Sequence, residues 1–300
     1  MANKKSGRIA VPFLVTIFLG LLLVGGAAWY ILKMITKEEA PPEPPARSGG
    51  ITITEEDSHT ILFILDTPDQ NSKYSFMVMR SVPIRKKILF IGVPANMTAV
   101  IDDTQKNLSD EYAKNSTSGA MDFVSRVFGI EIDRYMKLDS EAFQRICDML
   151  GGVTYPIDVD VPGLQADGTE QTMNAKQIET YITYAMFDDG EEGRATNSAY
   201  IIQKMINGTD TGRIADNIDR YYEEIINMNG HVDTDITSVD YQDRIGAIKS
   251  MLNYHSTEVS SSMIASATGV DGKTYEGDFL PSASFINNLP NEFFGTGDEE

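Results

Sequence analysis

Side chains that could take part in chemistry occur at only a few places in this chain. Asp66 closes the apolar run ILFILD at residues 61–66. At the end of a buried strand, a carboxylate can bind a hard cation such as Mg²⁺ through its oxygens. An aspartate at such a position is also a common turn or capping residue. The sequence leaves both interpretations open.

An acidic run, DDGEE at residues 188–192, precedes Arg194. The run could bind calcium or form a solvated acidic loop. The Arg194 guanidinium could contact a phosphate, or it could form a salt bridge with Glu191, Glu192 or Asp189.

A small basic cluster, made of Arg80, Arg85, Lys86 and Lys87, surrounds a predicted hairpin. These side chains could bind a phosphate, or they could protect the strand ends from aggregation. The sequence alone does not separate these two roles.

Common catalytic and metal-binding motifs are missing from the sequence. His59, His231 and His255 are scattered, so no histidine spacing suggests zinc. The single cysteine, Cys147, excludes an intramolecular disulfide and lies on an apolar helical face, where a thiol packs as a small hydrophobe. Nucleophile-elbow, zinc-protease and phosphate-loop patterns do not occur.

The charge of the chain restricts its partners. The formal net charge is −19, and residues 1–50 hold six basic and three acidic residues, so residues 51–300 carry −19 − 3 = −22. Nucleic-acid recognition normally uses a basic patch, so nucleic acid is not an expected partner. Because the domain as a whole is acidic, an anionic ligand would have to bind at a local basic site.

The elements that must position these residues follow from the apolar patterns. Short, nearly continuous apolar runs predict strands covered on both faces, at residues 59–66, 75–82 and 87–93. Stripes of helical period predict helices around residues 121–128, 143–150, 199–206, 214–225 and 241–252, with Gly151 ending the second and Ser238 capping the last. A further strand is predicted from Ser256 to Ile264. These elements predict an α/β fold, namely an α-β-α layered domain with a central mixed sheet.

The N-terminal region predicts membrane attachment. Residues 9–35 carry no acidic residue and exceed the roughly 20 apolar residues that span a bilayer. The flanking charges keep residues 1–8 in the cytoplasm and place the rest outside. The small residues 25–28 leave a cleaved signal peptide as the alternative. We expect a Pro-rich linker at 36–50, the extracytoplasmic domain at 51–290 and an acidic tail at 291–300.

Five local motifs occur in an order that resembles one bacterial family. They are the run ending at Asp66, GVPAN at 92–96, DMLGGV at 148–153, MNAKQIETYITYA at 173–185 and EEGRATNSA at 191–199. Together they resemble the LytR-CpsA-Psr family of membrane-anchored cell-envelope proteins.

The resemblance implies a phosphotransferase that attaches glycopolymers from polyprenyl pyrophosphate carriers to peptidoglycan, with bound Mg²⁺. Carboxylates would hold the cation, and arginines would bind the pyrophosphate. The resemblance also implies an apolar groove for the prenyl chain near Phe63, Met77, Met79 and Phe90, although core packing is the default role of such residues.

Most polar positions of the family pattern are replaced in this sequence. Asp66 and Arg194 match, and Glu191 stands where an aspartate is usual. Where the pattern has arginines or acids, this chain has other residues: Pro68, Tyr74, Ala95, Asn96, Thr183 and Asn197. Because several losses of this kind should leave little activity, we expect a degenerate family member that has kept a prenyl-linked ligand or acts with other envelope proteins.

Two alternatives remain open. A rearranged transferase would use Asp66 with Glu191 or Asp103 around Mg²⁺, and Arg194 or Arg80 on phosphate. A structural or interaction module at the cell surface would have a filled core and no groove.

Overall fold

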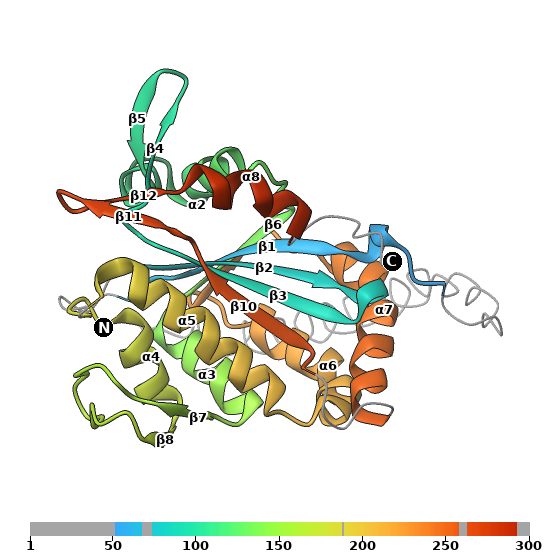
Figure 1. Cartoon of the computed structure of the whole chain (residues 1–300). Helices are drawn as coiled ribbons and strands as arrows, with labels where there is room; N and C mark the ends of the chain where they lie inside the picture. The colour runs from blue at the N-terminus through green and yellow to red at the C-terminus, as the bar shows by residue number, and fades with distance from the viewer. Residues whose placement is uncertain (1–51, 68–73, 188, 258–262, 293–300) are drawn as a thin grey trace, which may run out of the picture. The chain divides into compact units, whose positions relative to one another are not determined.

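The computed structural model describes residues 52–67, 74–187, 189–257 and 263–292 (Figure 1). The three predicted strands are confirmed as β1 (His59–Leu65), β2 (Ser75–Val82) and β3 (Lys87–Val93), which pair antiparallel in sequence order. Their sheet is completed by β6 (Arg134–Leu138), β9 (Val232–Thr234) and β10 (Ala265–Gly269). The strand order is β10-β3-β2-β1-β6-β9. Because β6 and β10 pair parallel with β1 and β3, the sheet is mixed, as predicted.

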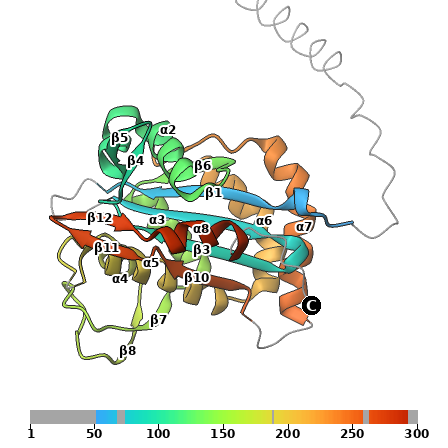
Figure 2. The same cartoon turned by 45° about the horizontal axis from the view of Figure 1, so that its top comes forward.

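Helices cover both faces of this sheet, which explains the nearly continuous apolar strands. One face packs against α2 (Leu108–Phe128) and α8 (Ala283–Glu292), which lie over the same side in both views (Figures 1 and 2). The other face is covered by five helices: α3 (Ser140–Leu150), α4 (Ala175–Thr183), α5 (Gly190–Asn207), α6 (Thr211–Ile226) and α7 (Ser238–Thr257). The predicted α-β-α layering is therefore confirmed.

Helix α5 lies unusually close to the sheet because two strand residues lack a side chain. A Cβ atom added at Gly92 of β3 would lie 1.9 Å from the Ala195 carbonyl oxygen. At Gly269 of β10, it would lie 1.8 Å from Oγ1 of Thr196. These contacts fix the first turns of α5, and with them Arg194, against one end of the sheet.

Two local predictions need correction. Ser238 is the first residue of α7 and does not cap it; the cap is Thr237, whose Oγ1 accepts a 3.1 Å hydrogen bond from the Asp240 amide. The strand predicted at 256–264 is wrong at both ends, because residues 256 and 257 end α7 and the strand, β10, starts at Ala265, while residues 258–262 lie outside the described residues. Residues 256–264 are mostly polar, and such a stretch between a helix and a buried strand does not reveal where either element ends.

Three two-stranded hairpins and two short 3-10 helices were not predicted from the sequence. The hairpins are β4 (Thr98–Ile101) with β5 (Thr104–Asn107), β7 (Val153–Pro156) with β8 (Glu170–Met173), and β11 (Gly272–Tyr275) with β12 (Asp278–Pro281). The 3-10 helices are η1 (Glu55–Asp57) and η2 (Pro83–Arg85). All six of these strands have only four residues and few buried side chains, so their alternation is too short to recognise.

Several predicted segments lie outside the described residues: the cytoplasmic N-terminus 1–8, the membrane span 9–35, the linker 36–50 and residues 293–300 of the tail. Residues 291 and 292 belong to α8. Within the described ranges, no helix is both long enough and apolar enough to cross a membrane.

The close approach of α5 can be tested with Gly92→Ala. The added methyl group meets backbone, which cannot rotate away, so we expect the free energy of unfolding to fall by about 1–3 kcal/mol or more. The measurement is denaturant unfolding followed by circular dichroism.

The matched control is Gly208→Ala at the end of the same helix, where φ is −84° and the nearest atom to an added Cβ is 3.2 Å away. A loss at Gly92 no larger than the loss at Gly208 would contradict the proposed close packing.

Candidate functional site

The carboxylate of Asp66 is held by two side chains from neighbouring elements. Asp66 follows β1, and its amide donates to the Leu138 carbonyl at 2.9 Å. Its Oδ2 accepts a 2.8 Å hydrogen bond from the Tyr112 hydroxyl of α2 and lies 3.2 Å from Nζ of Lys137 in β6. One oxygen of this carboxylate therefore already has a neutral donor and an ammonium group.

Tyr112 is fixed as a hydrogen-bond donor in this arrangement. Burial, followed by the hydrogen bond to Asp66 and the charge of that carboxylate, raises the pKa of Tyr112 far above its ordinary value. Its ring packs edge-on against Tyr74, with ring centroids 4.9 Å apart. The hydroxyl thus stays protonated and points at Asp66.

The guanidinium of Arg194 is buried, with 1% of the side chain exposed, and is bound on all sides by protein atoms. Nη1 donates to the Ile182 carbonyl at 2.6 Å, and Nη2 donates to the Tyr74 carbonyl at 2.9 Å. Nε donates to Oε1 of Glu191 at 3.2 Å, and Nη2 also donates to Oε2 of Glu191. These bonds use four of the five donors of a guanidinium. The salt-bridge interpretation of Arg194 is therefore confirmed, with Glu191 as the partner.

The structure brings Asp66, Arg194 and Glu191 to the same end of the sheet. Arg194 binds the backbone of Tyr74, whose ring contacts the tyrosine that binds Asp66. Lys137 and Tyr112 complete this group, and sequence reasoning missed both. The only signal for Lys137 was its place next to Leu138 in a short strand, and the parallel pairing of β6 with β1 could not be read from the chain.

Arg80 and Asp103 lie elsewhere. Arg80 pairs with Thr60 in the β1–β2 register, and its Nη1 donates to Oγ1 of Thr60 at 2.8 Å. Asp66 follows Thr60 by six residue steps along an extended chain, which corresponds to about 20 Å. Asp103 is exposed in the turn of the β4–β5 hairpin. A phosphate role for Arg80 stays a prediction, but it would be at the opposite end of β1 from Asp66.

The residues present do not fit a Mg²⁺ site. Among the described residues, no group of three or more His, Cys, Asp or Glu side chains could hold a metal ion. Lys137 neutralises Asp66, and Arg194 binds both oxygens of Glu191. Within the described ranges, a cation that prefers near-octahedral oxygen ligation therefore does not find the set of carboxylates that it needs.

Three of the residues that differ from the family pattern, Ala95, Thr183 and Asn197, pack or form hydrogen bonds within the fold. Ala95 is 4% exposed within the core under α2. Thr183 is 3% exposed, and its hydroxyl donates to the Glu179 carbonyl at 2.8 Å. Asn197 accepts a 3.0 Å hydrogen bond from the Tyr155 hydroxyl. An arginine at Ala95 or Thr183 would have to displace packed neighbours.

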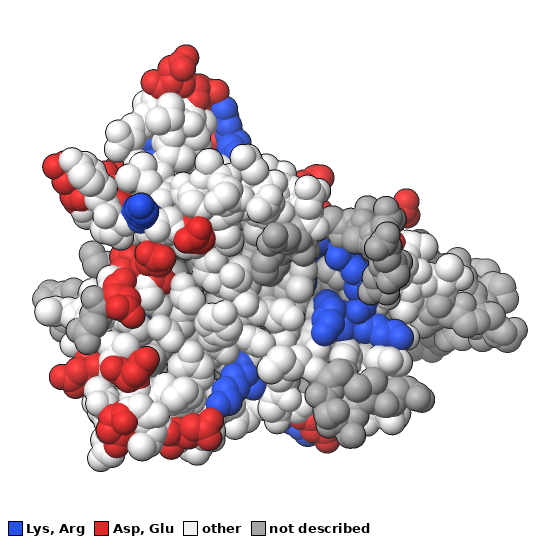
Figure 3. Space-filling view, in the orientation of Figure 1, with Lys and Arg blue, Asp and Glu red and all other residues white. Residues whose placement is uncertain are grey.

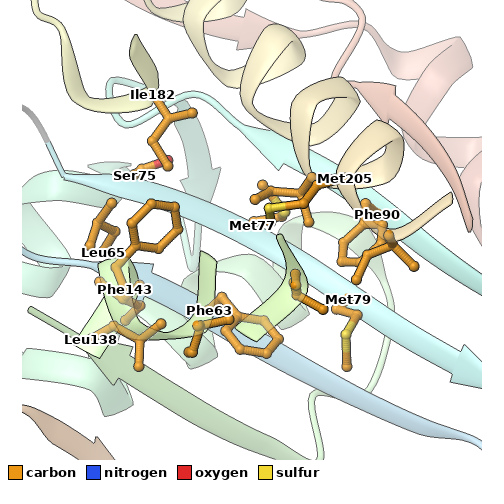
Figure 4. Close-up of a pocket in the computed structure, with 15 residues that line it drawn as sticks. Phe63, Leu65, Ser75, Met77, Met79, Phe90, Leu138, Phe143, Ile182 and Met205 are labelled. Carbon is orange, nitrogen blue, oxygen red and sulfur yellow. The ribbon is translucent and has the colours of Figure 1, made fainter. Parts of the chain in front are cut away.

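An apolar groove starts beside this group and runs between the sheet and the helices. Its first lobe, about 150 Å³, is lined by the four predicted residues Phe63, Met77, Met79 and Phe90 (Figure 4). Leu65 and Ser75 bring it to the Asp66 end. A second lobe of about 350 Å³ continues under α6 and α7, and both lobes share three lining residues: Met79, Ile146 and Leu150. The groove can hold an elongated apolar chain.

A mixed sheet between two helical layers, with an apolar groove that ends at a polar cluster, defines the class of this protein as a three-layered α/β protein. The model of the LytR_cpsA_psr family matches residues 38–287, and the chain belongs to this LytR-CpsA-Psr family.

Relatives and solved structures agree with this assignment. The Bacillus subtilis protein "Polyisoprenyl-teichoic acid--peptidoglycan teichoic acid transferase TagU" is 23% identical over 68% of this chain and 71% of its own length. "Biofilm regulatory protein A" of Streptococcus mutans is 23% identical over 91% of this chain and 73% of its own length. The crystal structure of B. subtilis TagV has a TM-score of 0.59 at 18% identity, covering 79% of this chain and 95% of that one. The structural likeness shows the fold alone.

The structural role of Arg194 predicts a large loss of stability in Arg194→Met. The change leaves the Glu191 carboxylate and the Tyr74 and Ile182 carbonyls without their donor, so we expect the free energy of unfolding to fall by about 3–5 kcal/mol. Denaturant unfolding measures it.

Lys204→Met on the same helix is the matched control. Its ion pair with Glu170 is largely exposed, so a loss below about 1 kcal/mol is expected. Similar losses for the two variants would mean that Arg194 does not anchor α5.

Proposed function

We propose that this chain is a cell-envelope protein that holds a polyprenyl-linked ligand in its groove and has little or no transferase activity. The proposal depends on one observation: both candidate charged groups at the groove mouth already have protein partners. Asp66 is bound by Lys137 and Tyr112. Arg194 is bound by Glu191 and two backbone carbonyls. The charged side chains that would have to act on a pyrophosphate are thus bound to each other or to backbone.

The groove supports binding without supporting transfer. Burial of an apolar chain contributes about 25 cal/mol per Å² of apolar surface, and this needs no charged residue. Transfer needs cations on the phosphates and a stabilised leaving group, and each missing electrostatic contact typically costs about 10² to 10³ in rate. The same protein can therefore bind the lipid and fail to turn it over.

Membrane attachment belongs to the proposal. We propose that residues 9–35 cross the bacterial plasma membrane once, with residues 1–8 in the cytoplasm and the folded part outside. The name of the TagU relative refers to polyisoprenyl-linked teichoic acid and peptidoglycan, which is consistent with an envelope ligand.

The two alternatives are less well supported. A rearranged transferase with Glu191 or Asp103 on Mg²⁺ would first have to release Glu191 from Arg194 or bring a hairpin turn to Asp66. A ligand-free interaction module would have a filled core, whereas this domain contains the two-lobed groove.

A calorimetric titration with farnesyl pyrophosphate tests binding and its metal dependence, using the full chain in lipid nanodiscs and empty nanodiscs as the blank. We expect binding with the same affinity in Mg²⁺ and in EDTA, because Lys137 already neutralises Asp66. Met79→Trp, which fills the junction of the two lobes, should weaken binding at least tenfold.

Val100→Trp is the control, since Val100 is 73% exposed on the β4–β5 hairpin. Binding that depends on Mg²⁺ would contradict the metal-free site, and unchanged binding in Met79→Trp would contradict the groove.

A turnover assay separates binding from catalysis. With a polyprenyl pyrophosphate-linked glycan and peptidoglycan, we expect glycan transfer at least about 10³-fold slower than by TagU of B. subtilis under the same conditions. Any residual rate should be the same in Asp66→Asn. A rate comparable to that of TagU, abolished by Asp66→Asn, would establish the rearranged transferase instead.

A further inference from the structure

Two polar side chains face the second lobe of the groove, the cavity of about 350 Å³ under α6 and α7, which we call the far lobe. Both carry polar atoms that form no hydrogen bond within the described residues. His59 and Ser81 are directly opposite each other in the β1–β2 register, so both point to the same face of the sheet. Each is 7% exposed. Within the described ranges, neither Nε2 of His59 nor Oγ of Ser81 has a hydrogen-bond partner, while Nδ1 of His59 lies 3.4 Å from Oδ2 of Asp133.

The surroundings make these two groups unusual. They line the lobe of about 350 Å³, whose other walls are mainly apolar side chains of α6 and α7, including Ile214, Ile218 and Ile248. Buried polar groups are nearly always paired, because leaving a donor or acceptor unmade costs free energy. A lobe with apolar walls and unmade hydrogen bonds at one end fits a molecule with an apolar chain and a polar head.

A basic side chain reaches the same lobe. Arg244 of α7 lines it, and its Nε is buried without a hydrogen-bond partner among the described residues. Its Nη1 donates to the Asp240 carbonyl at 3.3 Å and lies 3.8 Å from Oδ1 of that residue. The Asp240 carboxylate, however, is already held by both Nε and Nη2 of Arg134 at 2.8 Å. Arg244 therefore shares the Asp240 carboxylate with Arg134, and it also interacts electrostatically with Asp133.

The charged side chains near the far lobe indicate which net charge a bound head group can carry. In the view of Figure 3, basic side chains gather toward α7, whereas acidic side chains gather toward the opposite end of the sheet. Asp133 and Asp240 near the lobe disfavour a head with two negative charges. A carboxylate carries one negative charge and accepts from several donors, so it matches one arginine together with the serine and, when both of its ring nitrogens carry protons, the histidine.

We propose that the far lobe is a head-group site for a long-chain fatty acid, with its carboxylate at His59, Ser81 and Arg244 and its chain running past Met79 toward Asp66. The distance along β1 from His59 to Leu65, about 20 Å, accommodates an extended acyl chain. The head-group site is at the opposite end of the groove from Asp66 and is argued from its own residues, but the acyl chain would occupy the space proposed for the prenyl chain, so the two ligands would compete.

The test uses palmitic acid with a diazirine at its tail end, crosslinked to the full chain in nanodiscs and mapped by mass spectrometry. We expect labels near Leu65, Leu138 and Ile182, at the Asp66 end. Excess palmitate should compete at least tenfold better than hexadecanol. Labels confined to α6 and α7, or equal competition by the alcohol, would overturn the proposal.

Variants test the head group directly. Arg244→Gln should weaken competition by palmitate at least tenfold, while Lys249→Gln on the same helix should leave it unchanged, because Lys249 pairs with Asp219 and does not line the lobe. Ser81→Ala should also weaken binding, yet raise the melting temperature of the ligand-free protein, since it removes an unsatisfied hydroxyl. Unchanged palmitate binding in both Arg244→Gln and Ser81→Ala would overturn the proposal.

Discussion

The buried guanidinium of Arg194 holds together the elements around the groove mouth. Its hydrogen bonds tie α5 to the end of α4 and to the start of β2, while Glu191 on its own helix neutralises its charge. A buried charge of this kind is tolerated only when it is paired and hydrogen-bonded. The position of α5, and thus the wall of the groove, depends on this arrangement together with the close contacts at Gly92 and Gly269.

The fixed position of Arg194 also limits the chemistry that is possible at the groove mouth. An arginine that stabilises three elements is not free to follow a phosphate through a reaction, and a carboxylate paired with Lys137 is a poor cation ligand. The polar groups at the mouth are paired with other groups of the protein, while the apolar groove beside them is open. Paired charges at the mouth and an open apolar groove are therefore compatible in one protein.

The groove has different polar groups at its two ends. Asp66 and Lys137 stand at one end, paired with each other, and His59, Ser81 and Arg244 stand at the other with unmade hydrogen bonds. An apolar chain gains similar burial energy in either direction, so the head group decides the orientation. The far end offers the less satisfied donors, which favours a carboxylate there.

The sequence by itself determined the three central strands, the five helices with clear apolar stripes and the family motifs, because these depend on periodicity within one element. The resemblance of these motifs also singled out Asp66 and Arg194 as candidate site residues. Only the tertiary structure decided that Lys137 and Tyr112 bind Asp66, that Glu191 binds Arg194, and that His59 faces Ser81. These contacts depend on strand pairing and on side chains that meet across elements, and local sequence pattern does not encode the distances between such elements.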